Sequence, residues 1–246
     1  LSYDRDVFNA DFAGDGSATM LYTMAQFQAI KAAYNTGTAK SLVEAVNYIK
    51  TRGSNYNYDP EAVPDGTKAT TDVGVLYDQA VNPALLTLNM VMHGNLGVSS
   101  DRKAAYPKIM QIINDWAVAC DGVEYSVGTE AGANVGSNIA RVFYPYFVCF
   151  ELLRGNEAYS TPEYDAAIES WFRHLAETIK ASLKAWNDND YFGKQYYGSG
   201  AIGHSWGLMS IGYALKDADL VNFAVDCIDN PRDFYDCMQG CILMEG

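Results

Sequence analysis

The chain has 246 residues, enough for one large core, and no proline-rich, Gly/Ser-rich or single-charge run supplies a linker between two domains. Its 30 acidic and 17 basic residues give a formal net charge of −13, which argues against nucleic acid and anionic membrane surfaces as partners. No apolar run approaches the ~20 residues that a membrane span needs, and the N-terminus lacks the basic and apolar regions of a signal peptide. We therefore expect a single domain over residues 1–246, with no membrane partner.

Apolar residues recur at helical spacing through most of the sequence, without the sustained alternation of strands, so the predicted fold class is all-α. The first predicted helix covers 19–35 and the second covers 41–50. The polar stretch 52–72 is predicted to be a long loop within the domain. A helix over 78–93 follows, and Gly94 is expected to end it.

The second half of the chain continues with predicted helices over 100–120, 134–153 and 161–186, and two or three shorter helices fill 204–246. Helices of ten to twenty residues joined in hairpins, without self-similar repeats, favour an (α/α) toroid or an incomplete α/α barrel of helical hairpins. A closed toroid usually needs more helices than the sequence predicts. We therefore expect the natural domain to continue beyond Gly246.

The cysteines and histidines give no metal-binding pattern. The five cysteines lack the C-x-x-C spacing of metal sites, and the three histidines lie far apart, so no metal site is predicted. Cys120 and Cys149 lie in apolar segments and are predicted to be buried thiols. Cys227, Cys237 and Cys241 are close enough in sequence for one disulfide bridge, whose pairing stays open.

The 18 tyrosines exceed what packing alone usually demands. A tyrosine ring stacks on the face of a pyranose while its hydroxyl forms hydrogen bonds, so this content suggests sugar binding. Any single tyrosine is more simply explained as a half-buried residue of a helix.

The most informative segment lies between the helix that ends near Trp186 and an apolar helix predicted from Trp206. It contains an Asn/Asp cluster and a loop rich in glycine and tyrosine, and it ends in Gly203-His204-Ser205-Trp206. His204 is predicted to stand at the entrance of a helix, beside backbone that a ligand can approach closely. A helix N-terminus also favours bound anions, such as a uronate carboxylate.

This segment resembles the motif of the alginate-lyase-type polysaccharide lyases, in which two asparagines precede a histidine. The chain departs from that motif, because Ile202 and Gly203 stand where the family has its asparagines. The family's catalytic tyrosine and its arginine companion lie several tens of residues after the histidine, which falls at or beyond Gly246. Other segments are similar to successive helices of the family, namely Tyr77-Asp78-Gln79-Ala80, Trp116-Ala117, 134–141 and 151–155.

The resemblance implies a secreted or periplasmic lyase that cleaves a 4-linked polyuronate, of alginate or glucuronan type, by β-elimination. This reaction removes the proton α to a carboxylate and expels the 4-linked oxygen, so it needs a neutraliser, a base and an acid but no cofactor. The expected partner is the anionic polysaccharide. The expected catalytic residues are His204, Tyr196 and Tyr197. The expected substrate-binding residues are Asn134, Asn138, Arg141, Lys194, Gln195 and Trp206.

The polar loop over 52–60 is a second candidate site. Its Arg52, Tyr56 and Tyr58 would suit a lid over a sugar chain, and a surface loop without a catalytic role explains them equally well.

Two other function classes stay open. An (α/α)-toroid glycoside hydrolase would use two carboxylates, for which Glu124, Glu130, Asp188 and Asp190 are candidates outside any specific motif. A non-catalytic, helical glycan-binding protein would need no reacting group.

Overall fold

The computed structural model describes residues 20, 24–54, 73–96, 99–127, 134–189, 199–230 and 232–243. These residues form helices and the turns that join them, with no strand among them, which confirms the predicted all-α class. The helices are α2 (Met24–Thr36), α3 (Lys40–Ser54), α5 (Val73–Leu96), α6 (Ser99–Cys120), α7 (Val135–Leu153), α8 (Pro162–Asn189), α9 (Ser199–Leu215), α10 (Ala218–Val225) and α11 (Phe234–Leu243).

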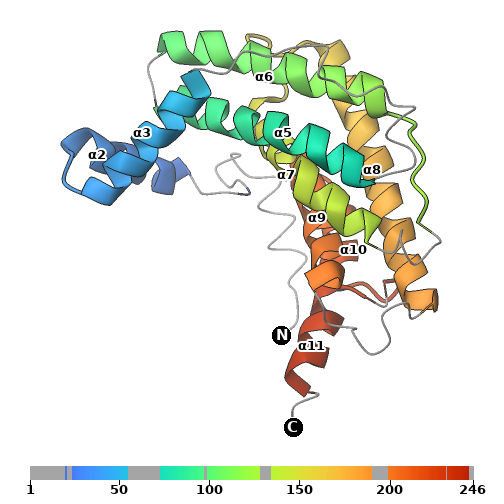
Figure 1. Ribbon diagram of the computed structural model, residues 1–246. Helices are drawn as coiled ribbons and strands as arrows, with labels where there is room; N and C mark the ends of the chain where they lie inside the picture. Colours follow the sequence, from blue (N-terminus) through green and yellow to red (C-terminus); the bar gives the residue numbers. More distant parts are fainter. Residues whose placement is uncertain are drawn as a thin grey trace.

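The helices form two connected groups (Figure 1). Helices α5 and α6 lie across the top of the view, and α8, α9 and α10 run downwards from them towards α11. Helix α7 is the central element, because it packs against α5, α8 and α9 and is buried along most of its length. Its apolar sequence explains this position, since a helix that is hydrophobic on nearly all sides must be covered on nearly all sides.

Aromatic side chains from three helices fill the core beside α7. The ring of Phe143 lies edge-to-face with Trp171 of α8, at 4.9 Å between centroids, and Trp116 of α6 lies 6.0 Å from Phe143. Each of these rings is buried. Such edge-to-face pairs add to the stabilisation that burial of the rings provides. The core therefore fixes the rotation of α7 and leaves one face of its N-terminal half outside.

Helix α9 runs beside α7 in the same direction, at very close range. A Cβ atom on Gly203 would lie 2.2 Å from the Ser137 hydroxyl oxygen, and one on Gly207 would lie 2.7 Å from the Cβ of Ala140. These contacts advance together along both helices, so the helices are parallel. Glycine is required at both positions because only a residue without a side chain permits this approach.

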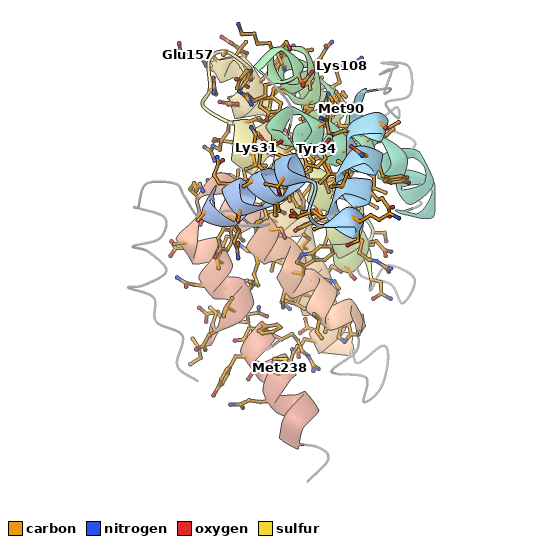
Figure 2. All side chains as sticks on the ribbon, turned by 90° about the vertical axis from the view of Figure 1, so that its left-hand side faces the viewer. Lys31, Tyr34, Met90, Lys108, Glu157 and Met238 are labelled. Carbon is orange, nitrogen blue, oxygen red and sulfur yellow. The ribbon has the colours of Figure 1, made fainter. Side chains whose placement is uncertain are left out.

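The N-terminal hairpin of α2 and α3 projects from this body (Figure 1). It packs on α5 through a small cluster around the buried Val46, with Ile30, Leu42 and Met92 as neighbours. Met92 also packs against the main core and so links the two clusters. Figure 2 shows α2 facing the viewer, with Tyr34 labelled on it.

The cysteines were predicted correctly in part. Cys120 and Cys149 are free and fully buried, and burial raises the pKa of both thiols to about 12. Cys227 and Cys237 are also free thiols, so the predicted disulfide among Cys227, Cys237 and Cys241 is wrong. The Cys241 side chain lies outside the described residues. Within the described ranges, no helix is both long and apolar enough to cross a membrane.

Candidate functional site

His204 lies inside α9, and the prediction that it stands at the helix entrance is wrong. The helix already begins at Ser199, and the imidazole has no exposed surface. Its Nδ1 lies 2.6 Å from the carbonyl oxygen of Gly200, and its Nε2 lies 2.8 Å from Oγ of Ser182. Because a carbonyl oxygen can only accept, Nδ1 carries the proton and donates it, and Nε2 of the neutral ring accepts from the serine hydroxyl.

The surroundings of His204 keep its ring neutral. Burial lowers the pKa of His204 from 6.5 to about 4, against the weaker opposing effect of the hydrogen bond to Gly200. The Ser182 oxygen also accepts the backbone N–H of Gly136 at 3.1 Å, so this network joins α7, α8 and α9. A ring enclosed in this way cannot touch a substrate. The predicted catalytic role of His204 is therefore corrected to a positioning role.

The exposed face of α7 carries polar and aromatic side chains. In its N-terminal half, the residues that keep exposed surface are Asn134, Asn138, Arg141 and Tyr144. Their spacing of three or four residues places them on one side of the helix. Asn134 is the N-cap residue of α7, but its side chain makes no capping hydrogen bond. The amide of Asn134 is therefore not used to cap the N-terminus of α7.

Helix α9 contributes a matching face that includes Trp206. The Trp206 side chain is 38% exposed, and its ring lies 4.7 Å from the ring of Tyr144, tilted by 41°. Because α7 and α9 pack closely, the two exposed faces form one surface, which we call the α7–α9 strip. It consists of Asn134, Asn138, Arg141, Tyr144, Ile202, Trp206, Met209 and Tyr213.

The N-terminal half of the strip favours anions. Arg141 is exposed and forms no ion pair or hydrogen bond with the described residues, whereas Arg154 and Arg173 are paired with carboxylates. Since α7 and α9 are parallel, their N-terminal ends lie side by side next to Asn134. Both helix dipoles therefore point their positive ends at the same place. A protein with a net charge of −13 thus has one surface suited to a carboxylate group.

The structure brings together four residues that the sequence predicted for substrate binding, namely Asn134, Asn138, Arg141 and Trp206. Sequence reasoning missed Tyr144. The sequence feature that could have revealed Tyr144 is its position three residues after Arg141, which places both side chains on the same face of a helix. The remaining predictions, Lys194, Gln195, Tyr196, Tyr197, Tyr56, Tyr58 and the side chain of Arg52, lie outside the described residues.

The carboxylates proposed for a glycoside hydrolase form no described pair. Glu124 is exposed, and Asp188 is bonded to Lys184 on the exposed side of α8. Glu130 and Asp190 lie outside the described residues. The two described candidates, Glu124 and Asp188, therefore do not form the carboxylate pair that this chemistry requires.

Comparisons with protein-family models, with curated proteins and with solved structures give no match to this chain. The resemblance of the segment around His204 to the alginate-lyase type therefore remains an expectation. The function is argued from the α7–α9 strip.

Proposed function

We propose that the chain is an (α/α)-toroid polysaccharide lyase that cleaves a 4-linked polyuronate by β-elimination, with the α7–α9 strip as part of its substrate-binding surface. The observation that carries the proposal is Arg141, which has no ion-pair partner among the described residues and lies on the same exposed face as the ring pair of Tyr144 and Trp206. An acidic sugar needs both an apolar platform and a cation. The strip supplies the two within one turn of a helix.

The strip offers a distinct contact to each part of a uronate. The exposed ring of Trp206, supported by Tyr144, stacks on the pyranose face. The guanidinium of Arg141 donates two parallel hydrogen bonds to the sugar carboxylate. The amide of Asn138, one turn earlier on the same face, donates a further hydrogen bond. Lysine at position 141 would be a poorer substitute, because its ammonium lacks the planar fork.

Neutralising the carboxylate is the first requirement of β-elimination. It lowers the pKa of the neighbouring C–H group, because the carbanion that forms there shares its charge with the carboxylate. Tyr196 and Tyr197 directly precede α9 in the chain and remain the candidates for transferring the proton. His204 supports the site indirectly, since its hydrogen bonds join α9 to α8 and, through Ser182, to α7.

Incubation with alginate and with glucuronan tests the proposal. Elimination leaves an unsaturated sugar that absorbs in the ultraviolet, so we expect absorbance to rise together with the number of reducing ends. Reducing ends without that absorbance would show hydrolysis and contradict the proposal. If the protein binds the polymer but produces neither new reducing ends nor ultraviolet absorbance, the result would instead identify a glycan-binding protein.

That second candidate, a non-catalytic glycan-binding protein, is favoured by one specific observation. The histidine that the lyase resemblance assigns to catalysis is buried and hydrogen-bonded on both nitrogens. The strip needs no reacting group to bind an acidic sugar. The ultraviolet assay separates the two candidates, because binding alone produces no unsaturated sugar.

A further inference from the structure

A buried carboxylate lies in the last turn of α7. The Glu151 side chain is an ionisable group, yet it is only 1% exposed, and its neighbours in the sequence are apolar. Its Oε2 accepts the backbone N–H of Met20 at 3.0 Å, and its Oε1 lies 3.8 Å from Nζ of Lys216, just after the end of α9. Oε1 accepts no hydrogen bond from the described residues. Glu151 thus contacts three segments that are far apart in sequence.

The groups that face Glu151 only partly stabilise a negative charge. Lys216, just after α9, is 38% exposed, and the described residue of the N-terminal segment, Met20, contributes its backbone N–H. From α7 comes Tyr144, a neutral hydroxyl whose pKa is raised by burial and, to a smaller extent, by Glu151. The nearby Arg154 is directed elsewhere, to the carbonyl of Ala214. The C-terminal end of α7 also disfavours a negative charge.

Two effects compete for the charge state of Glu151. The N–H of Met20 and the ammonium of Lys216 favour the carboxylate, whereas burial disfavours it. Burial is the larger effect, so the pKa of Glu151 is raised above its usual 4.5. A carboxylate that opens to water regains its ordinary pKa. Protonation therefore favours the closed arrangement, and ionisation favours opening.

Opening at this place affects the N-terminal hairpin. Met20 lies shortly before Met24, where the hairpin begins, and its side chain packs against the main core. The hairpin itself packs on α5 through the small cluster around Val46. The contact between Met20 and Glu151 is thus an attachment between the start of the hairpin and the main core, separate from that cluster.

We propose that Glu151 is a proton-controlled clasp. Protonated Glu151 holds the chain at Met20, and ionised Glu151 releases the chain. The released state hydrates the carboxylate and leaves the rest of the core folded. As the pH rises through the titration of Glu151, the start of the hairpin detaches from the end of α7. Lys216 moderates the clasp, because its charge lowers the cost of ionising Glu151 in place.

Hydrogen exchange of the Met20 amide tests the clasp. The rate at each pH is divided by the intrinsic rate, which gives a protection factor. We expect this factor to fall on the order of tenfold as the pH is raised through the titration of Glu151. Glu151→Gln has nearly the same shape and no charge, so its Met20 amide should stay protected at every pH. Glu169→Gln removes the carboxylate that pairs with Arg154 and should keep the wild-type transition.

Four results would overturn the clasp. One is a protection factor that does not change with pH in the wild-type chain. Another is a protection factor that rises on ionisation, which would mean that the charged hydrogen bond outweighs desolvation. The third is the same transition in Glu151→Gln. The amide of Ile179, in the buried part of α8, reports global unfolding in the same spectra, and loss of protection at both amides together counts against the clasp.

Discussion

The imidazole of His204 is shared by three helices and has no contact with solvent. A histidine that acts as a base near neutral pH needs a reachable nitrogen and a pKa close to the working pH. His204 has neither, because both nitrogens are hydrogen-bonded and its pKa is about 4. Its energetic contribution is therefore to the stability of the fold, and that contribution depends on pH.

His204 should make the protein less stable as the pH falls from about 6.5 to about 4. In this range the histidine of the unfolded chain takes up a proton and the folded one does not, so protonation favours unfolding. The complete effect of the shift is about 3 kcal/mol in the free energy of unfolding. Denaturant unfolding at a series of pH values measures it.

Variants must be compared because Glu151 also makes the free energy of unfolding depend on pH. Its pKa is raised, so its contribution changes with pH in the opposite direction to that of His204, in an overlapping pH range. His204→Gln has no titrating ring and should lose the His204 part of the slope. His174→Gln, which removes another histidine of a helix, should keep it. Equal slopes for wild type and His204→Gln would show that the buried ring is not the source.

The sequence could place His204 next to a functional surface, but it could not assign its role. The glycines at 200 and 203 indicated a loop, because glycine is a poor helix former. In the structure both lie in α9, where the missing side chain of Gly203 makes room for Ser137 of α7 and that of Gly200 makes room for Asn134 and Trp186. Whether a glycine serves a loop or a close helix contact depends on its tertiary neighbours, which a single sequence does not show.

At the level of helices, the seam between α7 and α9 is the contact that shapes the strip. Gly203→Ala should destabilise the protein by about 1 to 3 kcal/mol, because the new methyl group overlaps the Ser137 hydroxyl and forces the helices apart. The gain in helix propensity, roughly 1 kcal/mol, offsets part of this loss. Thermal or denaturant unfolding measures the net change.

A compensating change checks that the overlap is the cause. Ser137→Gly removes the hydroxyl and the Cβ that a side chain at position 203 would meet. Combined with Gly203→Ala, it should cost less than the sum of the two single changes. Strict additivity would mean that the seam does not limit the approach of the helices.

The helix boundaries show what periodicity predicts well. Helices were expected over 134–153 and 161–186, and α7 and α8 are found at Val135–Leu153 and Pro162–Asn189. Helix α5 is longer than expected, since it begins at Val73, before the predicted start at 78, and continues past Gly94 to Leu96. A strong apolar stripe defines a helix centre, whereas weakly patterned ends depend on packing.

At the level of the whole molecule, charge is distributed unevenly. The chain carries a net charge of −13, yet Arg141 has no carboxylate partner among the described residues. What suits Arg141 to an anionic sugar is its place on the exposed face that also carries the ring pair of Tyr144 and Trp206. The sequence predicted Asn134, Asn138, Arg141 and Trp206 as binding residues, but it could not show that they share one surface, because the parallel packing of α7 and α9 is a long-range property. Closure of the helices into a toroid would also depend on long-range packing.

The measurement that tests the central claim most directly compares Arg141→Ala with Arg102→Ala in the ultraviolet assay on a polyuronate. Arg102→Ala is the matched control, because it removes the same charge from α6, and α6 contributes no residue to the strip. Truncating one partner of a hydrogen-bonded charge pair costs about 2 to 5 kcal/mol, so kcat/KM should fall at least ~30-fold in Arg141→Ala and stay within about twofold in Arg102→Ala. Equal activity in the two variants would contradict the assignment of the substrate carboxylate to the α7–α9 strip.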